Sequence, residues 1–291
     1  MNAWQLLKNS TLDPGEAEML LAFLVGKERI YILTHPEIGV SATTVRNFQA
    51  LEKKRLAGWS MAAITREKEF YGLNFSVDKN VLIPRPETEL MVETALSLLN
   101  NSDQAATIID IGTGSGAIIV TLAHNTQISA AALYSKLSFY ALDISAAALK
   151  IARRNAQQNK QFSKIKFYRG NLIEPLIKSK SWPQITRDSI IICANLPYLS
   201  PRQVAQSPSI HKEPKLALIG GPDGLKYYRA LFKQLSKLNN KADGPDSYVL
   251  CEIDPSQSRT IQKLAKQYFP SSKIVMLKDL SGQYRLAQIK I

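Results

Sequence analysis

Short apolar runs recur through the second and third thirds of the chain and predict the strands of a buried sheet. Their shortness and their β-branched residues favour strands over helices. The runs lie at 106–110, 137–143, 189–194 and 248–253. Between them, segments such as 117–123 and 145–156 have the apolar spacing of helices. This alternation predicts an α/β fold of the doubly wound, Rossmann-like class.

The pattern that precedes this sheet is different and predicts a small helical bundle. Asp13 followed by Pro14 is typical of the start of a helix, and Gly26 is suited to ending it. No alternation typical of a strand appears through about residue 69. We expect this bundle to present a surface to a protein partner.

The chain is long enough for two domains and a connector. We expect a helical substrate-recognition domain at 1–69, a connector at 70–86 and the α/β domain at 87–291. Gly and Asn residues punctuate the connector, which favours a β-hairpin. Glu87 and Glu89 then lie in the first turn of a predicted helix, where the helix dipole favours acids. Near the end of the chain, 274–277 and 284–289 predict a closing strand pair.

A glycine-rich segment directly after the first apolar run is typical of a nucleotide-binding turn. Asp110 ends the run, and the loop that follows consists of Gly112, Thr113, Gly114, Ser115 and Gly116 after one Ile. Glycine lets the backbone turn tightly and approach a ligand without a Cβ clash. The spacing is G-x-G-x-G, which differs from the dinucleotide pattern G-x-G-x-x-G. The loop therefore suits a nucleoside with an amino-acid tail, whose ammonium Asp110 can bind directly or through water.

A second acidic residue supports a nucleoside ligand. Asp143 ends the next predicted strand, and Ser145 can cap the helix after it. A carboxylate at this position is well placed to accept hydrogen bonds from both ribose hydroxyls.

Asn195-Leu196-Pro197-Tyr198 follows the third apolar run and predicts an acceptor site for a planar NH2 group. Pro197 fixes its own φ and favours an extended Leu196, which aims the Leu196 carbonyl. The Asn195 side-chain oxygen is a second acceptor, and the Tyr198 ring offers a stacking surface. Two fixed acceptors can hold a weakly nucleophilic nitrogen in line with a sulfonium methyl group. Together the two motifs indicate methyl transfer from S-adenosylmethionine to a planar nitrogen, with no histidine base required.

These residues resemble the HemK-type family, the peptide chain release factor glutamine-N5 methyltransferases. The resemblance extends over nearly the whole chain through segments in the expected order. These segments are 16–24, 33–37, 69–75, 81–89, 213–218 and 221–225, besides the two motifs. The resemblance implies a seven-stranded class I S-adenosylmethionine-dependent methyltransferase domain behind a helical N-terminal domain.

The resemblance also implies a substrate and a set of roles. The substrate is the glutamine of the Gly-Gly-Gln loop of class 1 release factors, and its methylation supports translation termination. Residues 112–116 and Asp143 would bind the cofactor together with Asn195, with Leu172 near the adenine. Residues 195–198 would hold the glutamine amide.

Several positions depart from the family pattern. Leu196 stands where the family usually has Pro, a mild change because that position contributes a backbone carbonyl. Asn171 and Glu16 each stand where the family more usually has Asp. Ser60, Ala63 and Arg66 replace the Pro, Tyr and Gly that usually surround an Ile.

Other activities fit parts of the pattern. One alternative is methylation of a ribosomal-protein glutamine, although the Pro-Arg-Pro-Glu-Thr-Glu segment favours release factors. Another is adenine-N6 methylation of rRNA or DNA, because adenine dimethylases also have an Asn-Leu-Pro-Tyr motif. The helical domain ahead of the core argues against it. A binding protein without activity would need a broken cofactor site, and neither motif is broken.

Composition adds little to this interpretation. The net charge of +13 suits an acidic partner or RNA, but the Lys and Arg residues are scattered along the sequence, so direct nucleic-acid binding is not required. His35, His124 and His211 lack metal-ligand spacing, so we expect no metal. Cys193 and Cys251 fall in predicted strands and are expected to be buried thiols. No signal peptide or membrane span is apparent, and we expect a cytoplasmic monomer.

Overall fold

The computed structural model describes every residue except 101–104, 130, 180–187, 208–209 and 239–245. The chain forms two compact units. The first comprises Met1–Glu67 with residues 210–212, and the second comprises Lys68–Ser207 and Glu213–Ile291. Each unit has a hydrophobic core of its own.

The first unit is a bundle of short helices, as the sequence predicts. The helices are α1 (Ala3–Lys8), α2 (Pro14–Val25), α3 (Arg29–Thr34), α4 (Ala42–Leu56) and α5 (Met61–Thr65). The Asp13 side chain accepts hydrogen bonds from the backbone at the start of α2, and Gly26 ends this helix with a φ of 65°. Leu20, Leu21 and Phe48 are fully buried between the helices. Capping residues and apolar spacing together define this unit.

A two-stranded sheet follows the bundle and consists of β1 (Glu67–Phe70) and β2 (Leu73–Ser76). It begins two residues before the end of the helical segment that the sequence predicted. The reason is Arg66, which ends α5 in the left-handed conformation at a φ of 62°. Glycine is the usual residue for such a helix end, so Arg66 gives no sequence signal for it.

The second unit is built on a seven-stranded sheet in the order β5-β4-β3-β6-β7-β9-β8. Its strands are β3 (Ala106–Ile111), β4 (Leu137–Asp143), β5 (Ile165–Arg169), β6 (Ser189–Ala194), β7 (Ser247–Glu252), β8 (Lys273–Lys278) and β9 (Tyr284–Lys290). The first five in spatial order are parallel, and β9 pairs antiparallel with both β7 and β8. The prediction of a closing strand pair is therefore confirmed.

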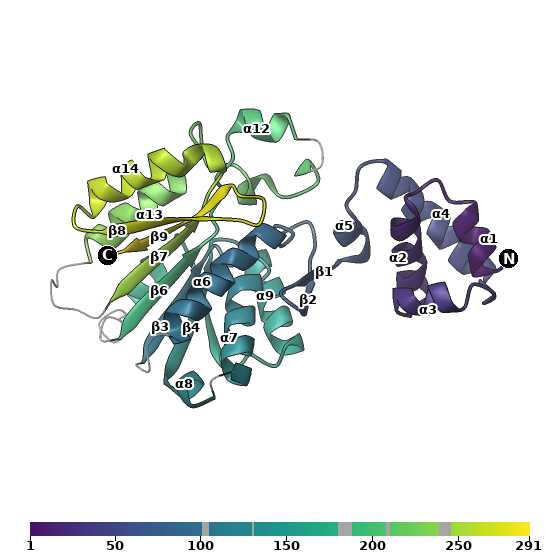
Figure 1. Cartoon of the computed structure of the whole chain (residues 1–291), viewed down its shortest axis with the longest axis horizontal. Coiled ribbons are helices and arrows are strands. Elements are labelled where there is room, and N and C mark those ends of the chain that lie inside the picture. Colours follow the sequence, from purple (N-terminus) through teal and green to yellow (C-terminus); the bar gives the residue numbers. More distant parts are fainter. Residues whose placement is uncertain (101–104, 130, 180–187, 208–209, 239–245) are drawn as a thin grey trace. The chain divides into compact units, whose positions relative to one another are not determined.

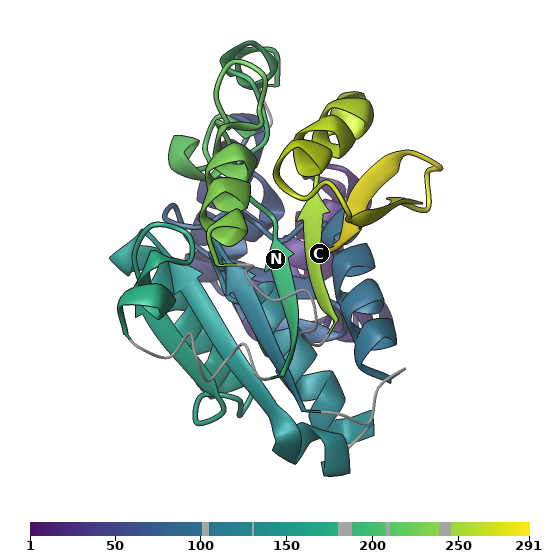
Figure 2. The same ribbon diagram turned by 90° about the vertical axis from the view of Figure 1, so that its left-hand side faces the viewer.

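Helices cover both faces of this sheet, as Figures 1 and 2 show. One face packs against α6 (Glu89–Asn100), α7 (Ala117–Ser129) and α9 (Ala146–Gln158), and the other against α13 (Lys226–Ser236) and α14 (Ser258–Tyr268). Shorter helices are α8 (Ala131–Lys136), α10 (Glu174–Lys178), α12 (Pro201–Ala205) and the 3₁₀ turns η1 (Pro86–Thr88), η3 (Lys215–Ala217) and η4 (Pro255–Gln257). The central strands β3, β6 and β7 are thus buried on both faces, which explains their continuous apolar runs.

The strand order places the two motifs at one edge of the sheet. From β3 the chain crosses to β4 on one side, and β6 pairs with β3 on the other side. In an open α/β sheet, such a switch of direction leaves a crevice beyond the carboxyl ends of the strands. The glycine loop follows β3, Asp143 ends β4 and Asn195 follows β6, so all three lie at this crevice.

Three further observations concern the sequence-based expectations. Cys193 and Cys251 are buried free thiols in β6 and β7. Among the described residues, no helix is long and apolar enough to cross a membrane. The same part of the chain contains no group of three or more His, Cys, Asp or Glu residues arranged to hold a metal ion.

Candidate active site

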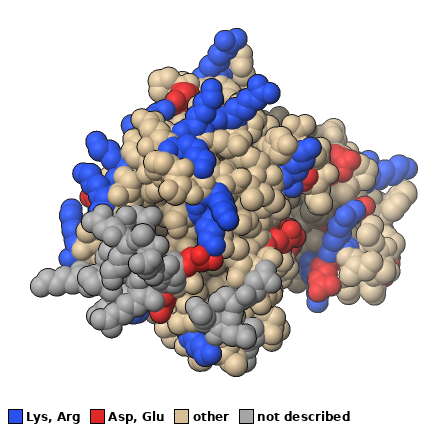
Figure 3. Space-filling view, turned by 60° about the vertical axis from the view of Figure 1, so that its left-hand side comes forward, with Lys and Arg blue, Asp and Glu red and all other residues tan. Residues whose placement is uncertain are grey.

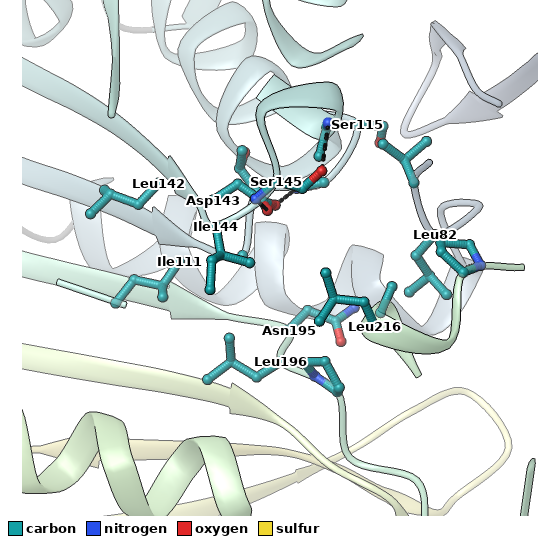
Figure 4. Close-up of a pocket in the computed structure, with 18 of the residues that line it drawn as sticks. Leu82, Ile111, Ser115, Leu142, Asp143, Ile144, Ser145, Asn195, Leu196 and Leu216 are labelled. Atoms are coloured by element: carbon teal, nitrogen blue, oxygen red, sulfur yellow. Dashed lines mark hydrogen bonds between the residues drawn. The ribbon is translucent and has the colours of Figure 1, made fainter. Parts of the chain in front are cut away.

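A cavity of about 320 Å³ opens at the carboxyl ends of β3, β4 and β6. Figure 4 shows Asp143 and Ser145 on one side of it and Asn195 and Leu196 on another. The predicted site residues that line the cavity are Gly112, Thr113, Gly114, Ser115, Asp143, Leu172, Asn195, Leu196 and Pro197. The structure thus brings together residues from three separate strand ends.

The glycine loop is held by the neighbouring strand. The backbone N–H groups of Gly112 and Thr113 both donate to the carbonyl of Leu142, at 2.8 and 2.9 Å. Gly116 has a φ of 82°, and a Cβ there would lie 3.2 Å from Cβ of Ala152 in α9. Gly116 does not line the cavity; it lets the loop enter α7 against α9. A side chain there would be strained by both conformation and packing.

Asp143 faces the cavity and is fixed by backbone donors. Its Oδ2 accepts from Gly114 N–H at 2.9 Å, and its Oδ1 accepts from Ser145 N–H at 2.8 Å. Burial raises the pKa of Asp143, and these backbone hydrogen bonds act in the opposite direction. The carboxylate also retains lone pairs that can accept hydroxyl groups from a ligand.

Asp110 lies beneath the loop and does not line the cavity. It is 1% exposed, and its Oδ2 accepts from the Thr113 hydroxyl at 2.6 Å. Its Oδ1 has no hydrogen-bond partner among the described residues. Burial raises the pKa of Asp110 to about 7. Thr113 lines the cavity and contacts Asp110, so a contact of Asp110 with a ligand, direct or through water, stays a prediction.

Asn195 reaches the cavity from the end of β6. Its Nδ2 donates to Thr88 Oγ1 at 3.1 Å. The N–H of Leu196 donates to the Tyr228 hydroxyl at 3.4 Å, and this hydroxyl also lies 3.0 Å from the carbonyl of Ala194. The turn is therefore anchored by side chains from η1 and α13.

Tyr198, which we predicted to be a stacking surface, contacts a buried carboxylate in this structure. Its ring does not line the cavity, and its hydroxyl donates to Oε1 of Glu252 at 3.0 Å. Burial raises the pKa of Tyr198, and so does the Glu252 carboxylate. By contrast, Leu172, which the family resemblance placed near the adenine, lines the cavity and has a φ of 52°. In this arrangement the Tyr198 hydroxyl ties the turn to Glu252 in β7, and stacking on a substrate stays a prediction.

Two segments outside the motifs complete the walls. Residues 79–85 except Ile83, and 214–217 except Lys215, line the cavity and contribute Leu82 and Leu216, which Figure 4 labels. Glu213 joins these segments because it accepts from the backbone N–H of Ile83 at 3.1 Å and forms an ion pair with Arg85. Neither sequence motif indicated that these two segments line the cavity. Residues 81–89 and 213–218 resemble segments of the family, but the sequence alone assigned them no role in the site.

The positive charge does not mark a separate site on the face seen in Figure 3. Lys and Arg side chains are spread over this face, with fewer Asp and Glu between them. Helices α13 and α14 contain no acidic residue, yet their Lys and Arg residues are spaced along the exposed side of each helix. On this face, the positive charge is therefore distributed and does not form a single patch.

Comparisons with known proteins support the assignment of both units. A model described as a methyltransferase domain matches residues 102–239, and one described as a PrmC N-terminal domain matches residues 2–65. A release factor glutamine methyltransferase of Dictyoglomus turgidum is 32% identical over 94% of this chain and 90% of its own length. The protein of the same name from Bacillus subtilis is 33% identical over 94% and 90%.

The chain belongs to the release factor glutamine methyltransferase family. The resemblance that the sequence suggested is thereby confirmed, as is the class I methyltransferase fold. Solved structures agree on the fold. The hMettl16 catalytic domain in complex with MAT2A 3′UTR hairpin 1 has a TM-score of 0.56 at 13% identity and covers 93% of this chain and 90% of its own. The N-terminal domain of human METTL16 in complex with SAH has a TM-score of 0.51 at 16% identity, covering 93% of both chains.

Proposed function

We propose that this protein transfers a methyl group from S-adenosylmethionine to the side-chain amide nitrogen, N5, of a glutamine. The proposed glutamine is that of the Gly-Gly-Gln loop of class 1 peptide chain release factors. Family membership supports this activity. The observation that carries the proposal is the presence of Asp143 and Asn195 at one cavity. Methyl donor and acceptor nitrogen must be held side by side for transfer, and this cavity offers a group for each.

The residues on the Asp143 side fit S-adenosylmethionine. Asp143 uses two acceptor positions for backbone N–H groups, and a carboxylate offers about four, so two remain for the ribose hydroxyls. Leu172 and Ile144 give apolar surface for the adenine. The Oδ1 atom of Asp110, which has no partner in the described chain, fits a water-mediated contact with the ammonium of the cofactor. When bound, the cofactor supplies the electrophilic methyl group and leaves as S-adenosylhomocysteine.

The residues on the Asn195 side fit a primary amide. Because Asn195 Nδ2 donates to Thr88, its Oδ1 is the atom that can accept one N–H of the glutamine. The Leu196 carbonyl is the second proposed acceptor, in a backbone fixed by Pro197. An amide nitrogen is a weak nucleophile because its lone pair is delocalised. Two acceptors that hold it in line and favour pyramidalisation stabilise the transition state more than the bound substrate.

We further propose a division of labour along the chain. Residues 1–69 would recognise the release factor, 70–86 would act as a connector and 87–291 would bind the cofactor and carry out the transfer. The match of residues 2–65 to the PrmC N-terminal domain supports a specific role for the helical unit. This function requires neither a metal nor nucleic-acid binding and is consistent with a monomer in the cytoplasm, where translation ends.

Mass spectrometry would test substrate and chemistry together. Purified enzyme and S-adenosylmethionine are incubated separately with release factor, ribosomal protein and rRNA. A gain of one methyl on the Gly-Gly-Gln glutamine is expected, and its loss when that glutamine is replaced by glutamate is the matched control. Methylation of a ribosomal protein or of adenine instead would overturn the proposed substrate but retain the catalytic site. Absence of methyl transfer to all three would contradict the proposal.

A further inference from the structure

A fully buried side-chain amide joins the glycine loop to the hairpin of β1 and β2. Asn155 lies in α9, and none of its surface is exposed. Its Oδ1 accepts from the backbone N–H of Ser76 at 2.8 Å, and its Nδ2 donates to the Ser76 carbonyl at 2.9 Å. Nδ2 also donates to the carbonyl of Ser115 at 2.8 Å. Ser76 ends β2 and Ser115 lines the cavity, so one side chain connects the hairpin to the loop.

The partners of Asn155 require a side chain that both accepts and donates. A backbone N–H can only donate, and a backbone carbonyl can only accept. The Oδ1 atom therefore faces the N–H group, and the two hydrogens of Nδ2 face the two carbonyls. A carboxylate could not donate to both carbonyls, and an apolar side chain would leave all three buried groups without this partner. Because the partners are backbone groups, the link depends on the identity of Asn155 alone.

Asn155 holds a part of the loop that the neighbouring strand does not hold. The backbone N–H groups of residues 112–114 donate to Leu142 and Asp143, which lie at the end of β4. Asn155 instead comes from α9 and fixes the carbonyl of Ser115, just before the loop enters α7. The conformation of this end of the loop therefore depends on a contact from outside the sheet.

The hairpin has further contacts with the same helix but forms no wall of the cavity. Gln158 Nε2 and Asn159 Nδ2 both donate to the carbonyl of Asn74 in β2 at 3.3 Å. Figure 1 shows β2 beside α9, in agreement with these hydrogen bonds. No residue of β1 or β2 lines the cavity. Asn155 thus differs from Gln158 and Asn159, because it contacts both the hairpin and the loop.

We propose that Asn155 is a positioning residue that holds the glycine loop in its cofactor-binding conformation by linking it to the hairpin. This inference rests on the proposed function, because it takes the loop as the binding site of S-adenosylmethionine. It gives the connector a role in cofactor affinity in addition to joining the two units. Coupling between two sites is reciprocal, so a hairpin that favours cofactor binding is itself stabilised when the cofactor binds.

Calorimetry with S-adenosylhomocysteine tests the role of the amide. Asn155→Leu removes all three hydrogen bonds at nearly constant shape, and Asn155→Asp keeps the acceptor for Ser76 but cannot donate to both carbonyls. Each should raise Kd about tenfold, with kcat at saturating S-adenosylmethionine within about threefold of wild type. Gln158→Leu is the matched control, because it loses a contact with the same hairpin but none with the loop, and its Kd should stay within about twofold. A wild-type Kd in both Asn155 variants, or an equal rise in Gln158→Leu, would overturn the proposal.

Hydrogen exchange measured by NMR tests the same link in the unsubstituted protein, without a release factor. S-adenosylhomocysteine should slow exchange of the Ser76 amide at least about threefold, although Ser76 does not line the cavity, and should leave the amides of α2 unchanged. The slowing should be lost in Asn155→Leu and kept in Gln158→Leu. If the wild type binds S-adenosylhomocysteine with no change at Ser76, the inference fails and the proposed function stands. If the wild type does not bind it, the proposed function fails and this inference with it.

Discussion

The two sides of the cavity differ in how far they depend on side chains from elsewhere in the sequence. On the donor side, which comprises residues 112–116 and 143–145, most contacts join the ends of the adjacent strands β3 and β4 through backbone groups, and one remote side chain, Asn155, donates to the Ser115 carbonyl. On the acceptor side, which comprises residues 195–198, the turn is held by side chains from elsewhere in the sequence. These side chains are Thr88, Tyr228, Glu252 and Gln257.

This difference implies a difference in sensitivity. A backbone contact is retained by most substitutions, so the donor side depends mainly on glycine conformation, on Asp143 and on Asn155. Side-chain hydrogen bonds are lost with the side chain, and the members of a buried network polarise and orient one another. We therefore expect remote substitutions to impair the acceptor side, where they affect turnover, more often than the donor side, where they affect cofactor binding.

The largest expected effect is that of Asn195→Ala on the acceptor side. Loss of the side-chain acceptor should lower kcat by at least about 100-fold, because one positioned polar group at the reacting centre typically contributes that much. Cofactor Kd, measured by calorimetry, should change by less than about threefold, since a neutral amide at the edge of the cofactor site contributes little. Unchanged turnover would show that the glutamine is held by other groups.

The next prediction concerns the carboxylate beneath the donor side. The pKa of Asp110 is raised to about 7, so the unfolded chain loses this proton at lower pH than the folded protein does. Stability should therefore fall as pH rises from the unfolded pKa of about 4 toward 7, with a loss of about 2–3 kcal/mol between pH 5 and pH 8. Urea unfolding of wild type and Asp110→Asn without cofactor checks this, and the variant should lack this part of the pH dependence. Equal pH profiles would argue against a titrating Asp110.

On the donor side, Asp143→Ala tests whether this residue affects cofactor binding and not turnover. The variant loses the acceptor for Gly114 and Ser145 and the proposed ribose contacts, so cofactor Kd should rise about 10- to 100-fold, or about 1.4–2.8 kcal/mol. At saturating cofactor, kcat should recover most of its wild-type value, which Asn195→Ala should not show. A wild-type Kd by calorimetry would remove Asp143 from the cofactor site.

The smallest effect is expected from a remote acceptor-side support. Gln257 Nε2 donates to the carbonyls of Tyr198 at 2.8 Å and Asp223 at 3.1 Å. Gln257→Ala should lower the free energy of unfolding by about 1–2 kcal/mol. It should lower kcat about threefold and leave cofactor Kd unchanged. Gln267→Ala on the exposed side of α14 is the matched control and should be neutral. A loss of cofactor affinity in Gln257→Ala would contradict the separation of the two sides.

The amino-acid sequence determined the elements whose signals are local. The strands at 137–143 and 189–194 were predicted to the residue, because buried parallel strands are short, apolar and bounded by polar residues. Asp13, Gly26 and Ser145 cap helices in the structure as the sequence indicated. The two motifs and their placement at strand ends were also local features, and they were sufficient to predict a nucleoside site and an amide site.

Tertiary structure decided which side chains form hydrogen bonds with the residues of those motifs. Nothing local shows that Thr88 reaches Asn195, 107 positions away, or that Tyr198 donates to Glu252, 54 positions away. Nor does local sequence show that Asp110 lies under Thr113 and outside the cavity. Backbone conformation and apolar periodicity are properties of neighbouring residues, whereas burial and hydrogen-bond partners depend on how strands are ordered in the sheet. The sequence alone thus determined the fold and the two motifs, and only the packed sheet decided the burial that raises the pKa of Asp110 and the hydrogen bonds that support Asn195.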